Sequence, residues 1–173
     1  MATYKLIASS TVGSGGTTAI DFTSIPGTYT DLCLLLSLRH DTTDGDIRIR
    51  FNGSSSSIYS RINLYDSNGS AGSNSGSSET GFYTAGTSNQ SGYTASTFAN
   101  CMIYFPNYAG SNNKSFSKDG VTENNGTNIR LELSAGLWAS SSAITQITLE
   151  NSGSGTNKFV QYSTAYLYGI SNA

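Results

Sequence analysis

Charged side chains are scarce in this sequence. Of its 173 residues, 12% are charged, with 9 Lys and Arg against 11 Asp and Glu, for a formal net charge of -2 at pH 7. A typical soluble domain carries about 25% charged residues. No run of Lys or Arg appears that could neutralise the phosphates of a nucleic acid. We therefore expect no nucleic-acid partner.

Residues that commonly carry out catalysis are also few. The only histidine is His40, and nothing near it resembles the nucleophile elbow that a catalytic serine needs. We interpret His40 as an ordinary loop residue. The pattern assigns the apolar residues to sheets and to surfaces that other proteins cover, so we expect no buried ionisable group to do chemistry. The chain is predicted not to be an enzyme and to need no cofactor.

Cysteines, long apolar runs and a leader sequence are missing or nearly so. The two cysteines, Cys33 and Cys101, lie in apolar segments and are expected to be buried thiols, since a disulfide would need Cα atoms within about 7 Å. The longest apolar run, Leu32 to Leu36, is far below the roughly 20 residues of a membrane span. The first residues show no signal peptide, so we expect folding in a cytoplasm and no membrane partner.

Period-two alternation is what the sequence has in quantity. In Asp46 to Asn52 the apolar residues Ile47, Ile49 and Phe51 alternate with polar ones. Asn128 to Leu133 repeats the pattern, and so, more briefly, does Ile147 to Glu150. This pattern is typical of half-buried strands with an apolar inner face and a wet outer face.

Other strand-like segments are apolar on both faces. Asp31 to Arg39 and Ala99 to Phe105 are predicted to be central strands, or strands whose outer face is covered by an oligomer or a partner; Phe159 to Ile170 is a third such segment. Together with four shorter segments (Tyr4 to Val12, Thr18 to Phe22, Ser57 to Leu64 and Lys114 to Val121) they predict an all-β fold. We expect one domain over residues 1–173, an antiparallel β-sandwich or jelly roll of roughly 8–10 strands.

Two stretches between the expected strands draw attention. Asp66 to Thr80 is almost purely Ser, Gly and Asn, and we expect a long loop that packing against neighbours holds in place. Asp41, Asp44 and Asp46 gather three carboxylates around Gly45, which suits either a hairpin turn or a weak Ca²⁺ site. No other metal site is predicted.

The tyrosines are the more informative polar feature, because the chain contains 11 of them. A phenol ring offers an apolar stacking face together with a hydrogen bond, so it suits core packing, a subunit contact or a bound glycan. The candidates at expected strand ends and loops are Tyr59, Tyr65, Tyr83, Tyr93 and Tyr108, with Tyr104 beside them.

Several blocks of the sequence resemble a group of small virion proteins of tailed phages, of the kind found in environmental and cyanobacterial phages. The blocks are Tyr4 to Gly16, Phe22 to Leu32, Ile49 to Gly53, Tyr104 to Gly110 and Ser163 to Ile170. The resemblance covers nearly the whole chain, and it lies in the general character of these blocks and not in a strict motif. It implies a jelly-roll-like component of a phage particle and supplies no catalytic residues.

The resemblance leaves the place on the particle open. No heptad or repeat that could form a fibre stalk is visible, which favours a head decoration (cement) protein that binds the major capsid protein or another virion protein. Such a protein would be assembled into the virion in the bacterial cytoplasm, as a homo-oligomer with a trimer favoured by lattice geometry. The alternative is a host-glycan-binding module of a head or tail fibre.

Overall fold

The described part of the chain forms twelve strands in two antiparallel sheets. The computed structural model describes residues 1–43, 46–126, 128–153 and 155–171. In spatial order, the eight-stranded sheet contains β1 (Thr3–Thr11), β12 (Thr164–Ser171), β3 (Asp31–Leu38), β8 (Ala99–Phe105), β9 (Lys114–Val121), β10 (Arg130–Trp138), β5 (Tyr59–Ser67) and β6 (Ser70–Glu79). The four-stranded sheet contains β2 (Ala19–Phe22), β11 (Ile147–Asn151), β4 (Ile47–Phe51) and β7 (Phe82–Thr84).

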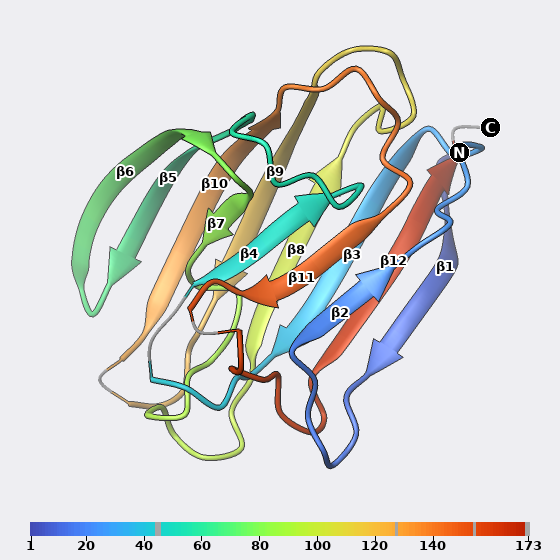
Figure 1. The fold of residues 1–173 in the computed structure, drawn as a ribbon. Helices are drawn as coiled ribbons and strands as arrows, with labels where there is room; N and C mark the ends of the chain where they lie inside the picture. Colours follow the sequence, from blue (N-terminus) through green and yellow to red (C-terminus); the bar gives the residue numbers. More distant parts are fainter. Residues whose placement is uncertain (44–45, 127, 154, 172–173) are drawn as a thin grey trace.

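The two sheets pack face to face as a β-sandwich (Figure 1). Alternation decides which residues fill the space between them: in β4, Ile47, Ile49 and Phe51 are buried, while Arg48 and Arg50 point outward to Glu150. Phe51 is the centre of an aromatic cluster, with its ring centroid 5.5 Å from that of Phe105 and 5.4 Å from that of Phe116 in the opposite sheet. The predicted fold class is therefore confirmed.

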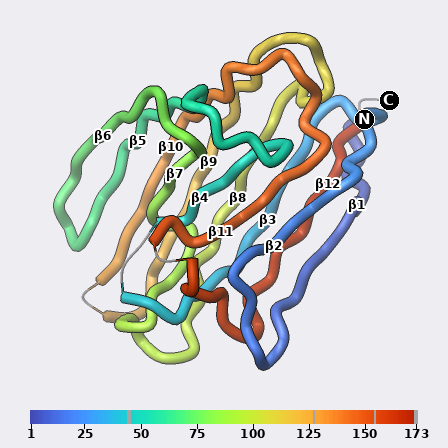
Figure 2. Tube along the Cα trace, in the orientation of Figure 1, coloured from blue at the N-terminus to red at the C-terminus, as the bar shows by residue number. Residues whose placement is uncertain are grey.

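The sheets differ in width, so the larger one extends beyond the smaller. The hairpin of β5 and β6 curves away past β7 at one side, and β1 lies at the far edge (Figures 1 and 2). Both edge strands, β1 and β6, are exposed or half-buried along their whole length. The shared apolar core consequently lies under the middle of the large sheet.

The Ser- and Gly-rich stretch is the clearest departure from expectation. Residues 70–79 form strand β6, paired antiparallel with β5, so the predicted long loop is wrong. Asn68 and Gly69 both have positive φ, 55° and 79°, which matches the two-residue turn that joins twisted antiparallel strands. The stretch is held in place by its own hairpin, and no neighbouring molecule is needed for that.

The two central strands were predicted correctly. β3 and β8 are direct neighbours inside the eight-stranded sheet, with Leu34 opposite Ile103. The C-terminal segment is shorter than expected, because β12 begins at Thr164 and Phe159 makes only isolated bridges to Thr17 and His40. No helix in the described part of the chain is long and apolar enough to cross a membrane.

Candidate functional site

The outer face of the eight-stranded sheet is the most unusual surface of the described structure. Residues paired directly across antiparallel strands point to the same side of a sheet. One such row runs across all eight strands: Ser9, Tyr166, Leu35, Met102, Asp119, Leu133, Leu64 and Ser73. Five of these eight side chains are large and apolar or aromatic.

These apolar side chains face solvent. Leu64 is 60% exposed, Leu133 is 56% exposed and Met102 is 44% exposed. Neighbouring rows add more exposed apolar side chains on the same face: Tyr4, Leu6, Ile62, Val121 and Leu131. We call this set, with the row above, the outer apolar face. Apolar surface of this extent, organised on one side of a rigid sheet, is typical of a protein interaction site.

One charge lies in the central row of the outer apolar face. Asp119 lies in the central row, between Met102 on β8 and Leu133 on β10, and its side chain is on the exposed side of β9. Tyr104 on the same face donates a hydrogen bond of 2.8 Å to Asp31, and that bond raises the pKa of Tyr104 to about 12. The face therefore offers apolar contacts around Asp119 at its centre, with two further carboxylates, Asp31 and Asp66, on the same side.

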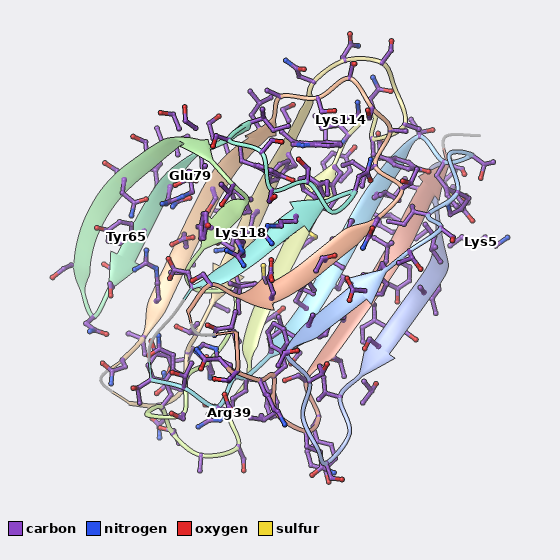
Figure 3. The ribbon with its side chains drawn as sticks, viewed as in Figure 1. Lys5, Arg39, Tyr65, Glu79, Lys114 and Lys118 are labelled. Carbon is purple, nitrogen blue, oxygen red and sulfur yellow. The ribbon has the colours of Figure 1, made fainter. Side chains whose placement is uncertain are left out.

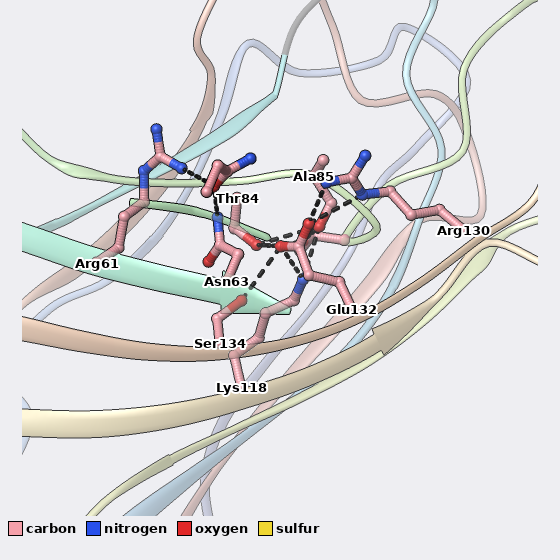
Figure 4. A network of polar contacts seen from close by, with 10 residues as sticks. Arg61, Asn63, Thr84, Ala85, Lys118, Arg130, Glu132 and Ser134 are labelled. Carbon is pink, nitrogen blue, oxygen red and sulfur yellow. Dashed lines mark hydrogen bonds and ion pairs between the residues drawn. The ribbon is translucent and has the colours of Figure 1, made fainter. Parts of the chain in front are cut away.

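The inner side of the same strands carries a buried cluster of charges. Lys118 and Glu132 are both 0% exposed at their side chains, with Lys118 Nζ 2.9 Å from Glu132 Oε1. Arg130 Nη2 lies 2.6 Å from Glu132 Oε2. Figure 4 shows these groups meeting at Glu132, and Figure 3 places Lys118 inside the sandwich, away from the peripheral Lys5 and Arg39.

The surrounding strands and the loop after β7 supply further hydrogen bonds to the buried pair of Lys118 and Glu132. Thr84 donates to Glu132 Oε1 at 2.9 Å, and Ser134 does so at 3.2 Å. Lys118 also donates to the carbonyl of Ala85 at 2.6 Å. Burial by itself would raise the pKa of Glu132, but Lys118 and Arg130 outweigh it and hold that pKa below its usual value. Glu132 is thus fixed as a carboxylate.

This cluster overturns two expectations. A buried ionisable group was not expected, yet Lys118 and Glu132 are fully buried, and Lys114 is buried as well, with its ammonium donating to the carbonyls of Gly110 and Asn112. The alternation in residues 128–133 was identified correctly, but its direction is reversed. Leu131 and Leu133 face solvent and Glu132 faces the interior. A one-residue shift of register or facing exchanges the two faces of a strand, and periodicity alone does not choose between them.

The predicted tyrosine candidates separate into two groups. Tyr59 and Tyr108 are buried, and Tyr59 stacks on Trp138 with ring centroids 6.4 Å apart. Both are core residues in this structure and present no surface to a partner. Sequence reasoning could not separate them from the others, because strand ends occur both inside and outside the sandwich.

The remaining three tyrosines are half-buried on different elements. Tyr65 lies under the guanidinium of Arg130, whose Cζ is 4.2 Å from the ring centroid. The hydroxyl of Tyr83 is 3.0 Å from that of Thr80 on the edge of the small sheet. Tyr93 lies in the loop after β7. The structure brings none of these three together into one shared contact surface among the described residues.

The candidate calcium loop is described only in part. Asp44 lies outside the described residues. Asp41 accepts a hydrogen bond of 2.8 Å from the backbone of Lys158, and the carbonyl of Asp46 accepts one from Ser152. Residues 1–43, 46–126, 128–153 and 155–171 contain no group of three His, Cys, Asp or Glu side chains that could hold a metal ion. Because Asp44 is one of the three proposed ligands, calcium binding at this loop stays a prediction.

The single histidine and the two cysteines are all buried. His40, expected to be an ordinary loop residue, lies just after β3 and is buried, with its Nδ1 2.8 Å from Ser88 Oγ. Both cysteines are free, as expected. Cys101 pairs with Leu36 and Cys33 with Tyr104, so the two thiols belong to opposite faces of the sheet. Burial raises the pKa of Cys101 to about 12, which keeps it a thiol.

Comparison with known proteins gives no relative to argue from. No family model matches the chain, and neither a curated protein nor a solved structure matches it. The β-sandwich class is therefore established by the strands themselves, and any function has to be argued from surfaces and sites.

Proposed function

We propose that this chain is a structural protein of a tailed-phage particle, a head decoration (cement) protein that binds the major capsid protein through the outer apolar face. The observation that carries the proposal is the row from Tyr166 to Leu64, in which five of six positions expose a large apolar side chain across rigid, paired strands. The sequence resemblance to small phage virion proteins supports the choice of partner.

The chemistry of the face specifies what the partner surface should offer. Covering Leu64, Leu133 and their neighbours removes apolar area from water, which stabilises a complex by about 25 cal/mol per Å² before the costs of association. Asp119, at the centre, would be left buried and unpaired unless the partner placed a Lys or Arg opposite it. We expect an apolar capsid surface with one basic residue.

The proposal includes self-association. β6 and β1 end the eight-stranded sheet, so each has one backbone edge without a neighbouring strand among the described residues. β6 is 10 residues long and rich in Ser and Gly, which leaves little side-chain bulk or charge to prevent strand pairing with another copy. A homo-oligomer, with a trimer favoured, would place several outer apolar faces on one capsid lattice.

The test uses heads purified from phage that lacks this protein. The double variant Leu64→Ser/Leu133→Ser is compared with Asp21→Ala/Thr148→Ala, which changes a hydrogen-bonded pair on the outer side of the small sheet. We expect co-sedimentation with heads to weaken at least about tenfold for the first variant, corresponding to 1.4 kcal/mol or more, and to be unchanged for the second.

Two results would contradict the proposal. Equal binding of both variants would show that the outer apolar face is not the docking surface. Heads that gain no heat resistance from the wild-type chain, while the chain binds a host surface polysaccharide, would favour the fibre alternative. Native mass spectrometry of the free chain measures the oligomer directly.

A further inference from the structure

A polar cavity lies at the end of the sandwich where β4 and β10 begin and β7 ends, the lower end in Figure 1. Its volume is about 210 Å³. Loops from both sheets line it, including His40, Ser88, Gln90, Tyr93, Thr122 and Asn128. At about 30 Å³ per water molecule, such a space holds roughly seven waters, or a single small ring with its substituents.

Two buried side chains in the wall of this cavity have polar atoms without a partner. His40 Nε2 and Thr122 Oγ1 form no hydrogen bond with any described residue, although each residue is only 1% exposed. The other nitrogen of His40 is fixed by Ser88 Oγ at 2.8 Å, which sets the ring orientation. Folded proteins rarely leave buried polar atoms unsatisfied. The cavity wall is therefore incomplete without an occupant that forms hydrogen bonds.

The wall is polar but carries little uncompensated charge. Burial outweighs the nearby Asp41 and lowers the pKa of His40 to about 4, so the imidazole is neutral at pH 7. The guanidinium of Arg130, which also lines the cavity, is paired with Glu132. Asp46 adds a carboxyl group to the wall, and burial raises its pKa. The other polar contacts come from amide and hydroxyl groups such as those of Gln90 and Asn128. An anion would find no unpaired cation among these groups.

We propose that this cavity binds one neutral sugar residue. Sugar hydroxyls both donate and accept hydrogen bonds, so they can satisfy His40 and Thr122 together. The half-buried ring of Tyr93 supplies the apolar surface against which a sugar ring can pack. Of the five tyrosines considered from the sequence, Tyr93 is the one that lines this cavity. The site is independent of the docking face and of the place of the chain on a particle.

The test is an NMR titration of the full ¹⁵N-labelled chain with glucose, galactose and N-acetylglucosamine, each also as its methyl glycoside. We expect saturable shifts at Ser88, Thr122 and Asn128, with a Kd on the order of 1 mM for one small ligand. Tighter binding of glycosides would assign the site to the end of a glycan chain. Tighter binding of free sugars would assign it to a soluble monosaccharide, and either result supports the site.

Variants separate binding from folding. Thr122→Val removes a hydroxyl that has no protein partner, so the variant should fold normally and bind at least about tenfold more weakly. Tyr93→Ala should also bind more weakly, whereas Tyr162→Ala, at a tyrosine that is 68% exposed elsewhere, should bind as the wild type does. The proposal is overturned by no saturable shift with any sugar, by shifts confined to other surfaces, by equal losses in Tyr93→Ala and Tyr162→Ala, or by phosphate binding more tightly than every sugar.

Discussion

The space between the two sheets is filled differently in its two halves. Around Phe51 it is apolar and aromatic, with Phe105 and Phe116 facing it from the large sheet. Around Glu132 it contains a lysine, a carboxylate and hydroxyl groups held by hydrogen bonds. The strands β10 and β5, whose inner residues are polar in this half, expose leucines on the outer side of the large sheet.

The comparison shows that the Glu132 half has its polarity reversed. Its strands bury Asn63 and Glu132 while Leu64 and Leu133 are exposed. Burying a charge pair rarely adds stability over well-packed apolar residues. Leucines exposed to water add no stability either. This arrangement is therefore costly for an isolated chain, and it becomes favourable when another protein covers the outer apolar face, as proposed above.

We expect the largest effect on stability for Glu132→Gln. This change leaves the Lys118 ammonium buried without a counter-charge, so we expect the free energy of unfolding to fall by about 3–5 kcal/mol. Urea denaturation at pH 7 measures the change. Asp119→Asn, on the neighbouring strand but on the exposed face, serves as the control and should stay within about 0.5 kcal/mol.

A paired variant sharpens the same test. In Lys118→Met/Glu132→Leu, both charges are replaced by apolar side chains, and we expect a smaller loss of stability than for Glu132→Gln. If the double variant is as unstable as the single one, the polar half is held together by shape and hydrogen bonds more than by charge, and the distinction drawn between the halves fails.

The reversal also explains which features the sequence could predict. Alternation identified β4 and β10 equally well, since both have a period of two. It correctly predicted which side of β4 points to the interior, where the aromatic Phe51 lies. For β10 it predicted the wrong side, because Glu132 is stabilised in the interior by Lys118 from another strand. One signal was available: Lys114 and Lys118 share a face of β9 with Phe116, whose aromatic ring favours the interior.

Alternation could not predict the hairpin of β5 and β6 or the cavity, and the cause is different for these two features. Ser and Gly have low strand propensity, so residues 70–79 suggested a loop, yet pairing with β5 overrides local preference. The cavity brings together His40, Ser88 and Thr122, which are far apart in the sequence. Contacts of that kind depend on topology, and a single sequence does not state them.

An intermediate effect is expected from pH at His40, which lies at the cavity end of the polar half. Its pKa is about 4 when folded and about 6.5 when unfolded, so the unfolded chain binds more protons between these values. Stability should be complete above pH 6.5 and fall by about 2 kcal/mol between pH 6.5 and pH 5. His40→Gln should lose that slope when unfolding is measured by urea at several pH values. An unchanged slope would place its origin in other groups.

The smallest effect should come from the outer apolar face, and its smallness is the informative result. Leu34 on β3 is buried, and Leu34→Ala should cost about 2–5 kcal/mol. Leu133→Thr changes a similar side chain that points the other way, so we expect a stability change within about 0.5 kcal/mol in the isolated chain. If Leu133→Thr proved as costly as Leu34→Ala, Leu133 would already be covered in the free protein, by another copy or by other parts of the chain. A negligible change in stability, combined with lost binding to heads, means instead that Leu133 serves the complex and contributes nothing to the fold. This behaviour separates a docking residue from a core residue of identical chemistry.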